Sequence, residues 1–269
     1  MVLSADAVYV QDYRELIREH MASEAAVTMV TTEVAPDDAD RYGVVQTEGG
    51  RITDYEYKPD EPQTSLVANE VFVFRPDPLL AALEELADAA GDDDLEDLGN
   101  EVLPRLVQDG GAREARFGGY WRDVGTVDAY WQAHMDLLED APPIDLDDPR
   151  WPVLTQAVGH RGAARIRPGA AIEGGLIAPA ATVAGTVERS IVSRGAVVEQ
   201  GAHVRDSVLL PGAKIRAGAR VERAIIDDDV EVGRDANIGK PGGELALVGL
   251  RATVEPAATL PAGARFPAT

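Results

Sequence analysis

The sequence of 269 residues contains no cysteine. Disulfide bonds, thiolate metal sites and cysteine nucleophiles are therefore excluded, and packing and hydrogen bonds have to hold the fold. Hydrophobic residues make up 45% of the chain, which is enough to bury one large core or two ordinary ones. We expect a protein that folds without covalent cross-links.

Basic residues are scarce, since 25 Lys and Arg stand against 47 Asp and Glu and the net charge is -22. This charge repels the phosphates of nucleic acids and anionic membrane surfaces, so we expect no nucleic acid and no membrane as partner. No run of about 18 apolar residues is present to span a membrane. The N-terminal residues Met1 to Asp6 lack the basic and apolar regions of a signal peptide. We expect a cytoplasmic protein.

Residues 1–140 alternate short apolar runs with helical patterns, as α/β domains do. Asp12 and Glu15 form a capping-box pattern that predicts one helix start, and Thr126 predicts another. The remaining periodic segments predict helices over 78–89 and 97–107 and strands over 27–30, 43–45, 51–55 and 66–74. A segment rich in Pro and Asp follows, so 141–165 is predicted to be a linker.

From Ile166 onward an aliphatic residue recurs every six positions, often with a glycine three places later. Such a hexapeptide repeat places one aliphatic side chain inside a three-sided coil at each step and a turn at each corner. We predict a left-handed parallel β-helix over 166–269 that serves as a scaffold and an oligomer surface. Its interior ladder is predicted to include Val192, Val198, Ile215, Val221, Val232 and Ile238.

Two aspartates are candidate metal ligands. Asp6 follows residues 2–4, whose apolar character predicts a buried parallel strand, and ligands of open α/β sheets bind at the carboxyl ends of such strands. Asp123 lies in a segment, 119–126, that is rich in aromatic residues and glycine. Two carboxylates form a hard oxygen site for Mg²⁺, which bridges phosphate oxygens in phosphoryl transfer. In so acidic a chain, solvated surface positions for both are the competing interpretation.

Three segments resemble the glucose-1-phosphate adenylyltransferase (ADP-glucose pyrophosphorylase) family: Leu3 to Tyr9 followed by Asp12-Tyr13, then Tyr120 to Trp131, and then Arg150 to Pro152. The resemblance runs in order across most of the chain, and the string Tyr-Trp-Arg-Asp-Val-Gly-Thr at 120–126 is specific to this family. It implies an α/β fold, a partial Rossmann-like nucleotidyltransferase domain at 1–140 followed by the β-helix. It also implies that Asp6 and Asp123 hold catalytic Mg²⁺.

The resemblance supplies candidate substrate-binding residues as well. Lys58 stands where the family places a lysine on the sugar phosphate, and Gly43 where a glycine lets the backbone approach the sugar. Tyr57 replaces a sugar-binding Glu, and Ala-Asn-Glu at 68–70 replaces a Ser-Met-Gly segment of the sugar pocket. A tyrosine cannot supply the two acceptor oxygens of a carboxylate, so Glu70 is a candidate displaced acceptor and the sugar specificity is left open.

The family begins with a Gly-Gly-x-Gly-x-Arg-Leu loop that cradles the nucleoside triphosphate, and this sequence has no counterpart of it. The chain therefore resembles a truncated reading frame or a fragment that holds the second half of the catalytic domain. Aligned substrate geometry contributes roughly 7–11 kcal/mol of barrier reduction. We expect the chain alone to lack pyrophosphorylase activity.

The resemblance implies Mg²⁺-dependent transfer of a nucleotidyl group from ATP to a sugar 1-phosphate, expected to be glucose 1-phosphate, in glycogen or α-glucan biosynthesis. A non-catalytic regulatory or structural subunit is the alternative, and a hexapeptide-repeat acyltransferase with a histidine base is a third hypothesis. The histidines give the third little support. His20 and His134 fall in helical patterns and His160 in the linker, where surface roles are usual, and His203 is expected to face solvent.

Overall fold

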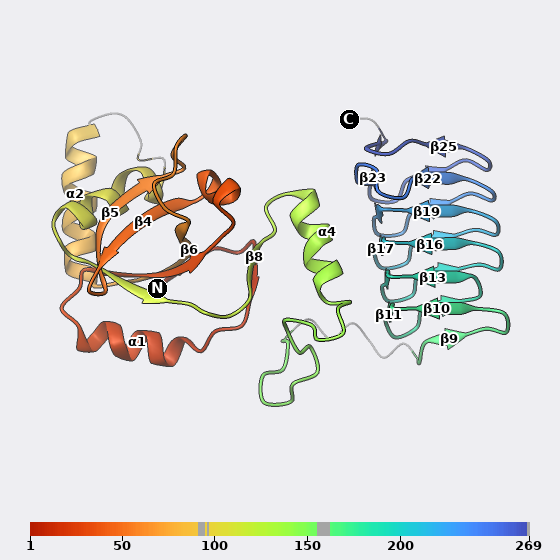
Figure 1. Ribbon diagram of the computed structural model, residues 1–269, viewed down its shortest axis with the longest axis horizontal. Coiled ribbons are helices and arrows are strands. Elements are labelled where there is room, and N and C mark those ends of the chain that lie inside the picture. Colours follow the sequence, from red (N-terminus) through yellow and green to blue (C-terminus); the bar gives the residue numbers. More distant parts are fainter. Residues whose placement is uncertain (91–94, 96, 155–161, 268–269) are drawn as a thin grey trace. The chain divides into compact units, whose positions relative to one another are not determined.

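The computed structural model describes residues 1–90, 95, 97–154 and 162–267 (Figure 1). His160 lies outside these residues. The chain divides into two compact units, Met1–Arg122 and Asp123–Thr269, each of which is described by itself. No helix in the described ranges is long and apolar enough to cross a membrane.

The first unit contains a six-stranded mixed sheet, in the order β1-β6-β3-β7-β5-β4, and a two-stranded sheet of β2 and β8. Its elements are β1 (Val2–Leu3), β2 (Ala7–Tyr9), α1 (Tyr13–Ala22), β3 (Val27–Glu33), the 3₁₀ helix η1 (Pro36–Arg41), β4 (Gly43–Glu48), β5 (Arg51–Tyr57), β6 (Leu66–Phe74), α2 (Pro76–Ala90), the π-helical turn η2 (Leu98–Val102), α3 (Leu103–Gln108), β7 (Ala112–Arg116) and β8 (Trp121–Asp123).

Strand β3 is central to this sheet and carries apolar side chains toward both faces. Met29 packs in the cluster formed with α2, η2 and α3, whereas Val30 packs with Leu16 of α1. The predicted strands and helices of this unit are found. Asp12 caps α1 as predicted, its carboxylate accepting a hydrogen bond from the Arg14 N–H at 2.9 Å. The sheet therefore has helices on both sides.

The prediction of a buried parallel strand at residues 2–4 is wrong. β1 pairs antiparallel with β6, and Val2 and Leu3 are 44% and 40% exposed. The reason is its place in the sheet: β1 is an edge strand with β6 as its neighbour among the described strands, so one side of it has no partner strand. An apolar pair of residues does not distinguish an edge strand from a central one.

The second unit consists of α4 (Val127–Asp136) and a β-helix of short strands. These strands are β9 (Arg165–Ile166), β10 (Ala171–Glu173), β11 (Leu176–Ile177), β12 (Thr182–Val183), β13 (Thr186–Glu188), β14 (Ile191–Val192), β15 (Val197–Val198), β16 (His203–Arg205), β17 (Val208–Leu209), β18 (Lys214–Ile215), β19 (Arg220–Glu222), β20 (Ala224–Ile226), β21 (Glu231–Val232), β22 (Asn237–Gly239), β23 (Ala246–Val248), β24 (Thr253–Val254), β25 (Thr259–Leu260) and β26 (Arg265–Phe266).

The strands form three parallel sheets stacked coil on coil (Figure 1). Val187 pairs with Val204 and Val204 with Val221, so these central coils are related by 17 residues. Such a coil is one residue shorter than three hexapeptides, because the step from Val187 to Val192 takes five residues rather than six. Coil length varies along the stack, since Ile172 pairs with Val187 15 residues later and Ile238 with Leu260 22 residues later. The hexapeptide prediction is confirmed, with steps of other lengths at some corners.

The interior ladder is confirmed as well. All six predicted ladder residues are at most 1% exposed: Val192, Val198, Ile215, Val221, Val232 and Ile238. The corner glycines Gly212 and Gly218 have φ of 75° and 76°, the left-handed region that glycine tolerates best. Ile166 in the first coil is 52% exposed because no coil precedes it within the described β-helix. Stacking on both sides is what buries the ladder.

Helix α4 belongs to the second unit by its packing. Trp131 and Met135 lie in one apolar cluster with Val208, Ile225 and Leu245 of the β-helix. The sequence motifs assign this helix to the domain 1–140, whereas its packing places it with the β-helix. By internal contacts the two compact units divide between Arg122 and Asp123, and the predicted boundary at the linker 141–165 stays a prediction.

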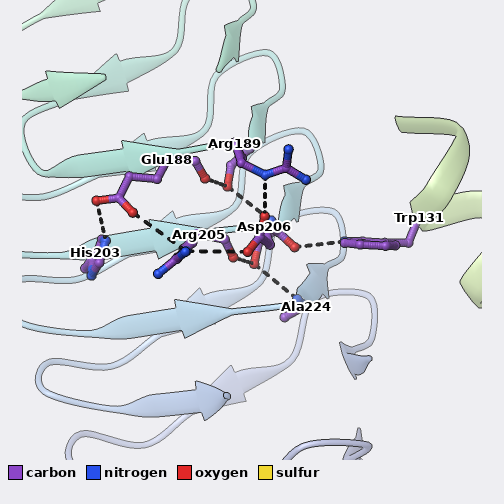
Figure 2. A network of polar contacts seen from close by, with 9 residues as sticks. Trp131, Glu188, Arg189, His203, Arg205, Asp206 and Ala224 are labelled. Atoms are coloured by element: carbon purple, nitrogen blue, oxygen red, sulfur yellow. Dashed lines mark hydrogen bonds and ion pairs between the residues drawn. The ribbon is translucent and has the colours of Figure 1, made fainter. Parts of the chain in front are cut away.

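Trp131 is also held by polar contacts (Figure 2). Its indole N–H donates to the Asp206 carbonyl oxygen at 2.8 Å, and the Arg223 guanidinium carbon lies 4.2 Å from a ring centroid. The Asp206 carboxylate accepts a hydrogen bond from Arg189 Nε at 2.9 Å and lies 3.5 Å from Arg205 Nε. Ion pairs with Arg189 and Arg205 on the coil surface thus hold Asp206, which accepts the hydrogen bond from Trp131 of α4.

The surface position expected for His20 is wrong. Its side chain is 4% exposed, its Nδ1 lies 2.8 Å from Thr28 Oγ1, and its Nε2 is buried without a protein partner among the described residues. Leu16 and His20 are one helical turn apart and form the buried stripe of α1. Burial, followed by the charge of Arg75, lowers the pKa of His20.

Because the pKa of His20 is lowered in the folded chain, the unfolded chain binds the proton better. The stability that the neutral ring contributes is present above the unfolded pKa of about 6.5 and is lost as the pH falls from there toward the lower pKa of the folded chain. We expect the urea midpoint of the chain to fall more steeply between about pH 7 and pH 5.5 than that of His20→Gln. Parallel pH profiles of the two chains would contradict the assignment. His134 is present in both chains, so its contribution to the pH dependence cancels in the comparison.

Candidate functional site

A cavity of about 310 Å³ opens in the first unit between the sheet and η2. Three of the predicted substrate-binding residues line it, namely Gly43, Tyr57 and Glu70. They come from β4, β5 and β6. Strand β4 pairs with both β5 and β6, and this places the three strands side by side. The structure therefore brings together residues that the sequence separates by up to 27 positions.

Glu70 occupies a strained backbone position in β6. Its φ is 61°, and the register between β3 and β6 shifts at this point, between Met29 and Thr31. A left-handed conformation costs a residue with a Cβ roughly 1–2 kcal/mol, and the family resemblance places a glycine here. The strand keeps the glycine-like backbone although the residue is a glutamate. Strain of this kind is concentrated at functional positions, and Glu70 lines the cavity.

Tyr57 and Lys58 lie at the end of β5. The Tyr57 hydroxyl donates to Asp97 Oδ2 at 3.1 Å, and the Lys58 ammonium is 4.8 Å from the centroid of the Tyr57 ring. Lys58 also has a left-handed backbone, with φ of 48°, fixed by a hydrogen bond from its N–H to the Tyr42 carbonyl. The hydrogen bond with Tyr57, and then the charges of Glu70 and Asp97, raise the pKa of Lys58. The lysine is therefore a cation held beside the cavity.

The sequence analysis missed Asp97, which also lines the cavity. Its carboxylate caps η2 by accepting from the Gly99 N–H at 2.6 Å, and its own N–H donates to Glu101 at 3.1 Å. The sequence signal for this cap was Asp97 followed by Glu101 at the start of the predicted helix 97–107, a pattern similar to a capping box. A Cβ on Gly99 would lie 2.6 Å from the Tyr57 ring, so the glycine is needed for this contact.

Gly43 has a packing role that the sequence did not indicate. A Cβ at this position would lie 2.5 Å from the Tyr55 hydroxyl oxygen, so the space that the glycine leaves is filled by a tyrosine ring. Tyr55 is buried, and burial, with smaller contributions from Tyr57, Asp97 and Glu70, raises its pKa. Gly43 thus lines the cavity and at the same time makes room for the neutral hydroxyl of Tyr55.

Asn69, the neighbour of Glu70, is fully buried, and neither amide atom has a hydrogen-bond partner within the described structure. The family resemblance places an apolar methionine here. Leaving a buried polar group unsatisfied costs about 1–3 kcal/mol. We expect Asn69→Leu, which keeps the branching at Cγ, to raise the free energy of unfolding by about that amount. Urea denaturation measures it against the exposed control Gln46→Leu, and a lower stability of Asn69→Leu would show that the amide is satisfied.

The two predicted metal ligands lie at ends of the paired strands β2 and β8. Asp6 directly precedes β2, is exposed, and accepts a hydrogen bond from Ser4 Oγ. Asp123 is the last residue of β8 and accepts a hydrogen bond from the Gly125 N–H at 2.9 Å. Asp6 belongs to the first unit and Asp123 begins the second, so their approach stays a prediction.

The donor set fits Mg²⁺ rather than a softer metal. Mg²⁺ commonly keeps several waters and binds through one or two carboxylates together with substrate phosphates. The described residues contain no group of three or more His, Asp or Glu side chains arranged to hold a metal by themselves. A magnesium site made of two carboxylates and the phosphates of a substrate needs no such group of three protein ligands.

The fold agrees with comparisons with known proteins. Residues 1–140 match the family model described as Nucleotidyl transferase, and residues 162–244 match the model described as GlmU-like, C-terminal hexapeptide. The first match covers more than half of the chain, and the chain belongs to the nucleotidyl transferase family.

Among curated proteins, the relatives are named glucose-1-phosphate adenylyltransferase. The one from Thermomicrobium roseum is 39% identical over 256 residues, the one from Corynebacterium jeikeium 34% over 260, and the one from Acetivibrio thermocellus 31% over 241. Each alignment covers 89% of this chain. The chain spans 56% of the length of the first and third relatives and 64% of the second.

Proposed function

We propose that this chain carries the sugar-phosphate side of a glucose-1-phosphate adenylyltransferase site, which transfers an adenylyl group from ATP to glucose 1-phosphate and releases pyrophosphate in glycogen or α-glucan synthesis. The observation that carries the proposal is the cavity in which Gly43, Tyr57 and Glu70 meet, with the Lys58 ammonium beside it. The names of the relatives support the choice of substrates.

Each residue has a distinct task in this proposal. Lys58 pairs with the dianionic sugar phosphate, for which a compact ammonium is a suitable point charge. Glu70 accepts hydrogen bonds from sugar hydroxyls in place of the glutamate that Tyr57 replaces. Because the Tyr57 proton is committed to Asp97, the Tyr57 oxygen faces the ligand as an acceptor.

The sugar phosphate oxygen attacks the α-phosphorus of the nucleotide directly, and no covalent enzyme intermediate is required. Mg²⁺, when bound to Asp6 and Asp123, supplies positive charge that offsets the charge on the phosphates. The chain's own contribution is to hold the attacking phosphate in line and to fix the sugar. A cytoplasmic location and a homo-oligomer assembled through the β-helix are part of the same proposal.

The test is binding of glucose 1-phosphate to the whole chain by titration calorimetry. Removing the cation in Lys58→Met is expected to weaken binding by about tenfold or more, since a hydrogen bond to a charged group contributes about 1.5–3 kcal/mol. Glu70→Gly is expected to raise the free energy of unfolding by about 1 kcal/mol, because it relieves the left-handed strain, and to weaken binding of the sugar phosphate.

Lys214→Met is the matched control, because Lys214 is exposed on the β-helix. Unchanged affinity in both cavity variants would refute the assignment of Lys58 and Glu70. The absence of saturable glucose 1-phosphate binding in the unaltered chain would favour the regulatory or structural subunit over the enzyme.

A further inference from the structure

A second cavity, of about 330 Å³, lies in the first unit and shares no lining residue with the one described above. Its walls are three turns: the β4–β5 hairpin tip at Gly49 and Gly50, the α1–β3 connection at 23–25, and the α3–β7 connection at Gly110 and Gly111. Two cationic side chains, Arg51 and Arg113, complete the lining. No candidate catalytic residue is among them.

Arg51 and Arg113 are direct cross-strand partners in β5 and β7. Their neighbours Ile52 and Ala112 are buried, and both arginines are exposed, so the two guanidinium groups project from the same face of the sheet. Like charges directly opposite each other in an antiparallel pair destabilise it. An anion bound between the two arginines would offset this repulsion.

Neither arginine forms an ion pair with a carboxylate in the described part of the chain, although the net charge is -22. Arg116, on the same strand as Arg113, differs: it pairs with Glu33 at 3.0 Å and with Glu114 at 2.7 Å. Glu24 is the one carboxylate residue that lines the cavity, so the lining carries two positive charges and one negative. The lining is therefore positive by one charge, although Glu48 is the cross-strand partner of Arg51 in the β4–β5 hairpin.

The hairpin tip adds backbone donors to this charge. Gly49 and Gly50 have φ of 59° and 80°, and Gly110 has φ of 76°. A Cβ on any of the three would meet nothing within 4 Å, so the backbone conformation rather than packing requires glycine at these points. The N–H groups of Gly110 and Gly111 donate to the Val107 and Leu106 carbonyls at 2.8 and 3.1 Å, whereas those of Gly49 and Gly50 have no such bond among the described residues. Successive N–H groups in a turn can form a concavity that binds an anion, and the hairpin tip offers them here.

We propose that this cavity binds a phosphate group, held by Arg51 and Arg113 and by the N–H groups of the hairpin tip at Gly49 and Gly50. Guanidinium groups match the geometry of phosphate oxygens, and two of them neutralise a dianion. The ligand is inorganic phosphate or a phosphate monoester of a small metabolite. The proposal does not rest on the nucleotidyltransferase activity, because it concerns a separate surface of the unit.

The test titrates inorganic phosphate and, separately, glycerol 3-phosphate into the whole chain by calorimetry, with the thermal midpoint as a second readout. We expect saturable binding, a rise of the midpoint with phosphate by mass action, and a loss of about tenfold or more in affinity in Arg51→Gln/Arg113→Gln. In buffer without phosphate the double variant should be at least as stable as the unaltered chain, because the repulsion between the two arginines is gone.

Arg18→Gln, an exposed arginine of α1, is the charge-matched control and should bind as the unaltered chain does. In Lys58→Met the proposed sugar-phosphate site has lost its cation, so saturable binding that remains in this variant, and that Arg51→Gln/Arg113→Gln removes, belongs to the cavity between the turns. Equal affinity for the two probes identifies a site for the bare anion, and preference for the ester identifies a phosphorylated metabolite. No saturable binding, or binding unchanged in the double variant, would overturn the proposal.

Discussion

Val221→Asp is expected to prevent the β-helix from forming. Val221 is fully buried and stacks in register between Val204 and Ile238. An unpaired carboxylate in this position costs several kcal/mol. A domain has about 5–15 kcal/mol of stability in total, so one such substitution removes a large part of it. Since each coil is buried only by its neighbours, the damage is expected to spread along the stack.

Arg220→Asp is the matched control for this variant, because Arg220 precedes Val221 in β19 and is exposed. Far-UV circular dichroism and urea denaturation compare the two chains. Trp131 provides a local signal, since its ring packs on the β-helix and its fluorescence should change when the coils unfold. Equal urea midpoints for Val221→Asp and Arg220→Asp would show that the ladder does not support the solenoid.

Asp123→Ala is expected to abolish nucleotidyl transfer in a chain that also carries the family's glycine-rich phosphate loop. Removing one electrostatic contact to developing charge commonly costs about 10²–10³ in kcat, and loss of a metal ligand should cost at least that much. Asp6→Ala should have the same effect, because the two carboxylates are proposed to share one ion. Pyrophosphate release at saturating Mg²⁺ measures both.

Asp128→Ala is the control, since Asp128 is an exposed carboxylate in the first turn of the helix that follows. The Asp123 variant should unfold at nearly the urea midpoint of the unaltered chain, because the hydrogen bond that its side chain accepts from the Gly125 N–H is local and exposed. Turnover within tenfold of the unaltered enzyme would remove Asp123 from the metal site.

The sequence predicted the elements whose signals are local. The six-residue spacing of aliphatic side chains predicted the β-helix ladder, because each coil repeats the same inside position. Asp12 and Thr126 predicted two helix starts, because a capping side chain bonds to an N–H two or three residues away. The five-residue steps from Val187 to Val192 and from Val204 to Leu209 are visible as breaks in the spacing, and the strand pairing shows that they stack at the same corner of successive coils.

The parts that the sequence could not predict depend on long-range pairing. Residues 2–4 have the composition of a central strand and form an edge strand, since strand order is set by partners far along the chain. His20 is buried because its turn of α1 faces the sheet. In the cavity, family resemblance proposed Glu70, but its left-handed backbone, and its place in one cavity lining with Asp97 and Tyr57, became visible only in the structure.

The packing of α4 on the β-helix determines where the polypeptide can be divided. A chain ending at residue 140, where the nucleotidyl transferase match ends, would keep α4 without its support and expose Trp131 and Met135 to water. A chain beginning at residue 123 would keep the helix, its apolar partners and Asp123 together. The same cut would divide strand β8, which pairs with β2, so neither point of division leaves all of these contacts whole.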